Sequence, residues 1–91
     1  MSERAQSHAI TWTQDRVADV PLNRYVGRAG TVEVGAVEFD GSNRMWLWSS
    51  PLADNAWGWA PNADAAKQAL EVWLRRWLEN FKPFFAGGSR D

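Results

Sequence analysis

Apolar residues follow two different spacings along this chain of 91 residues, and the spacing changes after Ala60. Before that point apolar and polar residues mostly alternate, which is typical of β-strands because their side chains point to opposite faces in turn. After it, apolar residues recur every three or four positions, which is typical of an amphipathic helix. The pattern therefore predicts a sheet followed by one carboxy-terminal helix.

The clearest strand signal is a pair of segments, Thr31–Phe39 and Arg44–Ser49, joined by Asp40-Gly41-Ser42-Asn43. The four joining residues tolerate the positive φ angles of tight turns, so the segments are predicted to form an antiparallel hairpin. In the first arm the apolar positions change parity near Gly35, which predicts a β-bulge or twist there. The second arm is apolar on both faces, with Trp46 and Trp48 on one and Met45 and Leu47 on the other, so it is predicted to be a central strand.

The amino-terminal half gives weaker strand signals. Ile10–Gln14 alternates and is predicted to be a short strand, and Tyr25–Gly27 is predicted to open another that ends at a turn near Gly30. The segment between them, Val17–Leu22, contains Pro21 and is interpreted as a connection. That connection is expected to bury its three large apolar residues, Val17, Val20 and Leu22.

A loop is predicted for residues 52–60, which are rich in turn formers. Asn62 is placed to cap a helix that runs from Ala63 to Lys82, where Pro83 stops it. The apolar stripe of this helix consists of Ala66, Leu70, Trp73, Leu74, Trp77, Leu78 and Phe81. Its other face carries charges of alternating sign four residues apart, at Lys67, Glu71, Arg75 and Glu79.

These elements predict an α+β fold, an antiparallel sheet of three to four strands with one carboxy-terminal amphipathic α-helix packed on one face. Residues 9–85 are expected to form a single domain, with disordered tails at 1–8 and 86–91. One helix covers only one face of a sheet. The other face is therefore expected to meet the amino-terminal segment or another chain, which is the reason to expect a homodimer.

Composition and charge narrow the function classes. A net charge of −1 provides no strong field for nucleic acid or anionic membrane. The chain has no cysteine, which excludes disulfides, thiolate metal sites and a cysteine nucleophile. No signal peptide or long apolar run is evident, so we expect a cytoplasmic protein with no membrane contact.

Candidate catalytic and metal-binding residues are few. The single histidine, His8, lies in the predicted tail, where a catalytic triad or histidine metal site cannot assemble around it. Glu38 and Asp40 share a strand face and form a conceivable acid–base pair, although a charged, solvated strand edge is the favoured interpretation. Asp54, Asn55 and Asp64 lie close in sequence but lack the spacing of a known cation loop. We therefore expect no enzymatic activity, no metal and no cofactor.

Seven tryptophans are the most informative residues: Trp12, Trp46, Trp48, Trp57, Trp59, Trp73 and Trp77. Trp57 and Trp59 flank Gly58 in the predicted loop and have two interpretations. They fold back and fasten the helix start onto the sheet, or at least one stays exposed and anchors a partner, because tryptophan is enriched at interaction hot spots.

Five segments carry a resemblance to other proteins: Val26-Gly27, Gly35-Ala36-Val37, Trp46-Leu47-Trp48, Gly58-Trp59-Ala60 and Asp64–Trp73. Together they resemble small uncharacterised α-proteobacterial and phage proteins with a tryptophan-rich β-hairpin and an alanine-rich carboxy-terminal helix. The resemblance covers residues 25–78 and implies the layout but no mechanism. The segment with a glycine before an alanine-rich helix is also similar to HicB-type antitoxins and to the last strand and helix of double-stranded RNA-binding domains. Those RNA-binding domains carry a basic cluster at the start of their final helix, and this cluster is missing here.

The expected function is that of a small non-enzymatic protein-interaction module of bacterial or phage origin, an inhibitor or regulator of a larger system. It is expected to bind a protein partner or itself through an aromatic surface formed by Trp57, Trp59, Trp46, Trp48 and Arg44. The alternative is a nucleic-acid-binding module that stacks Trp57 or Trp59 on bases and uses Arg28 and Arg44 on phosphates. The acidic residues among these arginines weaken that alternative.

Overall fold

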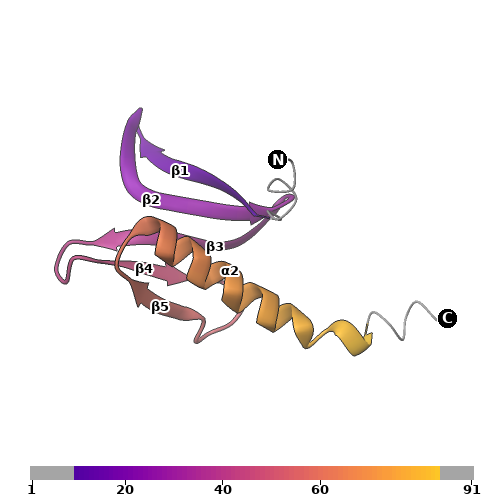
Figure 1. The fold of residues 1–91 in the computed structure, drawn as a ribbon. Coiled ribbons are helices and arrows are strands. Elements are labelled where there is room, and N and C mark those ends of the chain that lie inside the picture. Colours follow the sequence, from indigo (N-terminus) through magenta and orange to yellow (C-terminus); the bar gives the residue numbers. More distant parts are fainter. Residues whose placement is uncertain (1–9, 85–91) are drawn as a thin grey trace, which may run out of the picture.

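The computed structural model describes residues 10–84, which form one five-stranded antiparallel sheet and one long helix (Figure 1). The elements are β1 (Thr11–Val17), β2 (Val20–Ala29), β3 (Val32–Asp40), β4 (Met45–Ser49), β5 (Trp57–Ala60) and α2 (Ala63–Glu79). The strands lie in chain order across the sheet. The α+β class is confirmed, but the sheet has five strands rather than three to four. The predicted tails, 1–8 and 86–91, lie outside the described residues.

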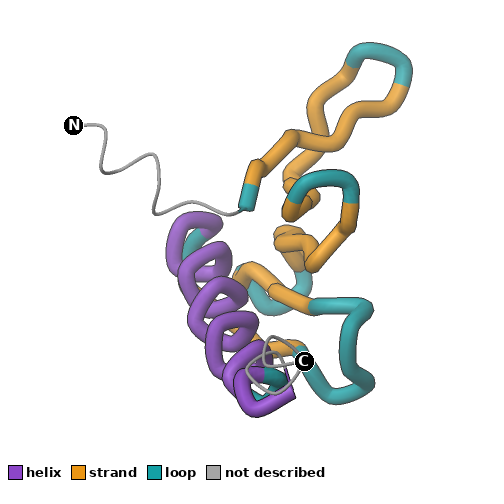
Figure 2. The backbone as a smooth tube through the Cα atoms, turned by 90° about the vertical axis from the view of Figure 1, so that its right-hand side faces the viewer, coloured by secondary structure: helices purple, strands orange, loops and turns teal. Residues whose placement is uncertain are grey.

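The first difference from the sequence prediction is the hairpin β1–β2. Val17 pairs with Val20, and Ala18 and Asp19 between them take φ angles of 49° and 69°, as a two-residue hairpin turn requires. The predicted connection over Val17–Leu22 is therefore wrong. The expected burial is wrong for Val17 and Val20, which are 61% and 59% exposed, whereas Leu22 is partly buried. Figure 2 shows this hairpin extending away from the helix.

Pro21 is compatible with β2 because of where β3 ends. The pairing of β2 with β3 reaches only to Arg24 opposite Glu38, so Pro21 lies beyond β3 and has only β1 beside it. A proline lacks the backbone N–H that an interior strand position needs, and an edge position tolerates this loss. Pro21 therefore marks the part of β2 that leaves the main sheet.

The predicted irregularity at Gly35 is confirmed. Gly27 pairs with Gly35 and Arg28 with Glu33, which leaves Val34 as an extra residue in β3. A Cβ atom on Gly35 would lie 2.5 Å from Cδ2 of Leu70 and 2.6 Å from a backbone oxygen of β4. Gly35 therefore allows α2 to approach the sheet closely, and the bulge explains the change of parity along β3.

The hairpin β3–β4 is also confirmed, with one difference in its turn. Positive φ falls on Arg44, at 58°, rather than on the residues Asp40 to Asn43. The carboxylate of Asp40 accepts hydrogen bonds from the hydroxyl of Ser42 at 2.6 Å and from its backbone N–H at 2.8 Å. The side chain of Asp40 thus holds the turn together.

The second correction concerns residues 52–60, which are not all loop. Trp57–Ala60 forms β5, which pairs with β4 so that Trp46 faces Ala60 and Leu47 faces Trp59. The turn formers around this segment hid its alternation of large and small residues. Because β5 flanks it, β4 is an interior strand, as its two apolar faces predicted.

Helix α2 begins as predicted and ends earlier. The side chain of Asn62 accepts a hydrogen bond from the N–H of Ala65 at 2.8 Å, which confirms the cap. The helix ends at Glu79 instead of Lys82, and Pro83 lies in a further helical turn over residues 82–84. It packs on β3, β4 and β5 through its buried residues Ala66, Leu70 and Leu74.

The polar face of α2 forms only part of the predicted charge ladder. Arg75 lies 3.7 Å from Glu71, but Lys67 instead places its ammonium group 4.2 Å from the ring centroid of Tyr25 and 5.6 Å from that of Trp12. A cation above aromatic faces is a favourable contact. Lys67 therefore links the start of the helix to β1 and β2.

Candidate functional site

The sheet face that α2 leaves uncovered carries an apolar surface, here called the tryptophan patch and made of Met45, Leu47, Trp57 and Trp59. Register places the four side chains on the face opposite to Trp46 and Trp48. Trp57 is 54% and Trp59 43% exposed. Their ring centroids are 6.3 Å apart in an edge-to-face arrangement. Two neighbouring indoles therefore face solvent.

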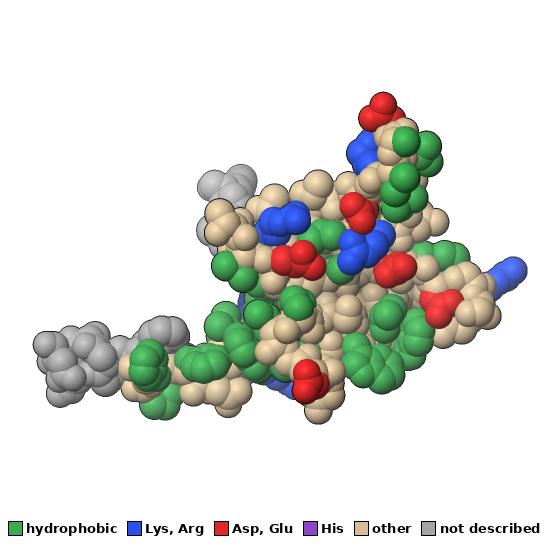
Figure 3. Space-filling view, turned by 180° about the vertical axis from the view of Figure 1, so that it is seen from behind, with side chains coloured by type: hydrophobic (Ala, Val, Ile, Leu, Met, Phe, Trp, Pro, Cys, Tyr) green, Lys and Arg blue, Asp and Glu red, His purple; other side chains and the backbone are tan. Residues whose placement is uncertain are grey.

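The other half of the same face is charged. Arg24 on β2 lies 2.9 Å from the carboxylate of Asp15 and 3.6 Å from that of Glu38, which flank it on β1 and β3. The same row continues through Leu47 to Trp59 and so changes from charged to apolar across the sheet. Figure 3 shows this face, with acidic and basic side chains gathered above the hydrophobic ones.

The structure does not bring the five predicted binding residues together. Trp46 and Trp48 lie on the helix-facing side, half-buried, where Trp46 contacts Tyr25 and Phe39 at centroid distances of 6.2 and 5.7 Å. Arg44 lies in the β3–β4 turn and is exposed. Trp57 and Trp59 alone of the five form a contiguous exposed pair, because strand alternation sends Trp46 and Trp48 to the other side.

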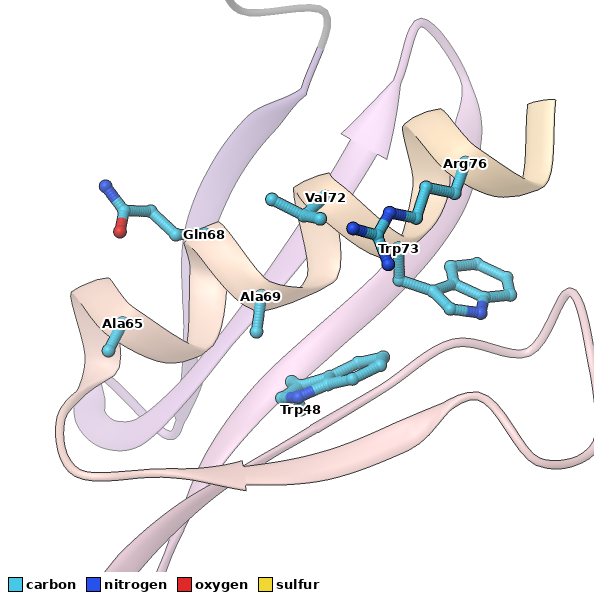
Figure 4. Close-up of a pocket in the computed structure, with 7 residues that line it drawn as sticks. All are labelled: Trp48, Ala65, Gln68, Ala69, Val72, Trp73 and Arg76. Carbon is cyan, nitrogen blue, oxygen red and sulfur yellow. The ribbon is translucent and has the colours of Figure 1, made fainter. Parts of the chain in front are cut away.

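Sequence reasoning missed a groove between α2 and the indole of Trp48 on β4, with a volume of about 490 Å³. Its floor is the indole of Trp48, and Trp73 forms one wall with its ring centroid 6.5 Å away (Figure 4). The lining residues on the helix are Ala65, Gln68, Ala69, Val72, Trp73 and Arg76. The available signal was a second helix stripe of small residues, at Ala65 and Ala69, beside a strand that contains Gly58.

Beyond the groove, aromatic residues continue along α2. Trp73 stacks on Trp77 with centroids 5.7 Å apart, and Trp77 meets Phe81 edge-to-face at 5.0 Å. Trp73 and Trp77 also pack against the core cluster of Ile10, Val34 and Leu74. These rings are thus part of the fold and stabilise the second half of the helix.

The conceivable acid–base pair, Glu38 and Asp40, lies at a small hollow of the structure. Glu38 and Asp40 line a hollow of about 250 Å³, together with Phe39, Gly41 and Leu47. Hydrogen bonds from the hydroxyl and backbone of Ser42 hold the pKa of Asp40 below its usual value of 3.8. Glu38 pairs with Arg24. A general acid at neutral pH requires the opposite shift, so the hydrogen bonds from Ser42 favour a structural role for Asp40 in the β3–β4 turn.

Within residues 10–84, no three or more histidine, aspartate or glutamate side chains gather as a metal site would require. None of the described helices is long and apolar enough to cross a membrane. Comparisons with models of protein families, with curated proteins and with solved structures find no significant match.

Proposed function

We propose that this chain is a small, cytoplasmic, non-enzymatic protein-interaction module of bacterial or phage origin that binds a protein partner or a second copy of itself through the tryptophan patch. The observation that carries the proposal is the exposure of Trp57 and Trp59 on a sheet face that none of the described elements covers. Hydration of two exposed indoles is unfavourable, and a partner that covers them gains that free energy.

The position of the patch suits a docking role. Trp57 and Trp59 lie on a short strand whose other face is packed, so the backbone beneath them is held in place before binding. Rigid tryptophans anchor interfaces well because a large apolar area is buried at little cost in conformational entropy. The charged row formed by Asp15, Arg24 and Glu38 borders the patch and supplies the polar rim that such interfaces have.

The nucleic-acid alternative is less well supported. Arg24 lies in the same cross-strand row as Leu47 and Trp59 of the patch. Its guanidinium group forms ion pairs with Asp15 and Glu38. Glu38 also stands between it and the tryptophans, so a phosphate backbone that approached the patch would meet a carboxylate. A strand that stacks on indoles needs a basic groove beside them.

Light scattering coupled to size-exclusion chromatography tests the proposal, applied to the wild type and to the double variant Trp57→Ala/Trp59→Ala. We expect the wild type to self-associate or to retain a protein partner in pull-down, and the double variant to lose this while remaining folded. Phe84→Ala removes another exposed aromatic side chain, outside the patch, and serves as the control. A monomeric wild type whose partner retention equals that of the double variant would refute the proposal.

A further inference from the structure

The outer edge of β5 has backbone groups available for pairing. Ser50 donates its N–H to the carbonyl of Ala56 at 2.9 Å, which identifies these opposite residues as a hydrogen-bonded pair. Bonded pairs alternate in an antiparallel ladder, so Gly58 bonds to β4 while Trp57 and Trp59 point their N–H and C=O groups outward. Among residues 10–84 no strand follows β5 in the sheet. This edge can therefore accept another strand.

The groove lies beside this edge, on the helix-facing side. A strand added to β5 would place the side chain opposite Gly58 on the same face as Gly58, which is the face that α2 covers. There it would meet Trp48 below and Ala69 and Val72 above. Because Trp48 lies flat over Gly58 and Ala69 has only a methyl group, the space between the indole and the helix suits one large apolar side chain.

A charge complements the apolar part of the groove. Arg76 lines its far end, and Figure 4 shows its guanidinium group directed back along α2 toward Val72 and Trp73. The guanidinium group of Arg76 is exposed and makes no ion pair or hydrogen bond with any of residues 10–84. A guanidinium beside an apolar pocket is well suited to a carboxylate, which it binds through two parallel hydrogen bonds.

We propose that the groove binds an extended peptide segment of a partner protein, which adds to β5 as a sixth strand. Its large apolar side chain lies opposite Gly58, between Trp48 and Ala69, and a carboxylate two positions along, toward Ala56, pairs with Arg76. Alternate side chains of a strand share a face, which sets this spacing. The inference rests on the proposed function, that of a protein-interaction module, and names the chemistry of the partner.

A second copy of this chain fits the groove poorly. Two β5 strands paired about a two-fold axis keep both helices on one side of the joined sheet, so each copy presents its own helix-facing residues to the other. On β5 these are Gly58 and Ala60. A hydrogen atom and a methyl group leave the space between Trp48 and Ala69 unfilled, which favours a different chain as the occupant.

The test uses the full chain and a display library of random linear peptides. We expect the enriched peptides to share a large apolar residue and an acidic residue two positions apart. Loss of a charge-assisted pair should make Arg76→Glu bind them roughly tenfold more weakly or worse, and Ala69→Trp should block them by filling the groove. Arg16→Glu, the same charge change at an exposed position of the distant β1–β2 hairpin, should bind as the wild type does. Amide hydrogen exchange of Trp57 and Trp59 should slow in the complex.

Failure of this inference is separable from failure of the proposed function. The groove is excluded if no peptide is enriched, or if folded Ala69→Trp and Arg76→Glu variants bind the enriched peptides as the wild type does. If partner binding is then still lost in Trp57→Ala/Trp59→Ala, the proposed binding through the tryptophan patch is supported and the proposed peptide binding in the groove is refuted. If instead the two groove variants lose partner binding and the double tryptophan variant keeps it, binding in the groove is supported and binding through the tryptophan patch is refuted.

Discussion

The indole of Trp48 lies over Gly58, so close that a Cβ atom on Gly58 would stand 2.7 Å from Nε1 of the ring. The two residues are direct partners across β4 and β5. The missing side chain of Gly58 thus allows Trp48 to lie flat enough to form the floor of the groove and to meet Trp73. One glycine therefore connects the packing of the helix-facing side to the shape of a candidate binding site.

Gly58→Ala is expected to displace the indole of Trp48 and to lower the free energy of unfolding by about 1–3 kcal/mol, the usual cost of overpacking. Chemical denaturation measures this change. Gly41→Ala is the matched control, because its added Cβ would meet only Cε2 of Phe39 at an ordinary 3.9 Å. Equal stabilities of the two variants would show that Trp48 moves aside without cost.

Gly35→Ala is expected to be more damaging, with a loss of about 3 kcal/mol. The added carbon would lie 2.6 Å from the backbone oxygen of Ser49 as well as 2.5 Å from Leu70, and a backbone atom in a sheet cannot rotate away. Thermal unfolding followed by circular dichroism checks this. A variant as stable as Gly58→Ala would mean that the helix shifts outward over β3.

Alanine at Trp57 or at Trp59 is expected to lower the free energy of unfolding by about 1 kcal/mol or less, because each side chain is largely exposed and contributes mainly surface pair contacts. Leu70→Ala is the contrast, since Leu70 is fully buried and should lose roughly 2–5 kcal/mol. Denaturant titration compares the two. A loss at Trp57 as large as that at Leu70 would support the fastening role instead.

The hydrogen bonds from Ser42 to Asp40 predict a dependence of stability on pH. The pKa of Asp40 is lower in the folded state than its ordinary value of 3.8, so the ionised carboxylate stabilises the fold above that value. This contribution is lost as the pH falls through the lowered folded pKa. Ser42→Ala removes the hydroxyl donor and, with it, much of the lowering of the pKa of Asp40. Melting temperatures of wild type and variant should therefore differ at neutral pH and converge in acid, whereas a constant difference would contradict this account.

Local signals in the sequence predicted the elements that local chemistry controls. The Asn62 cap, the bulge beside Gly35 and the hairpin around Asp40 each depend on a few neighbouring residues, and all three are present. The hairpin tip at Ala18 and Asp19 was missed because Pro21 indicated a loop. The compatibility of Pro21 with a strand depends on how far β3 extends along β2, which no local pattern shows.

The candidate sites depended far more on tertiary structure. The five residues expected to bind do not lie together, because strand alternation divides the tryptophans between the two faces of the sheet. The groove was not predicted, because Trp48 belongs to β4 whereas Ala69 and Arg76 belong to α2, and the strand residue meets the helix residues only when α2 packs on the sheet.

By itself, the sequence determined the class of fold, the carboxy-terminal helix with its cap, and a chain that is unusually rich in tryptophan. These follow from residue type and spacing, which act over a few positions. Only the tertiary structure decided that Trp57 and Trp59 face solvent and that Arg76 lines a groove with Trp48. Pairing of β5 with β4, and packing of α2 on one face alone, are contacts between distant residues, and these contacts set which side chains remain exposed.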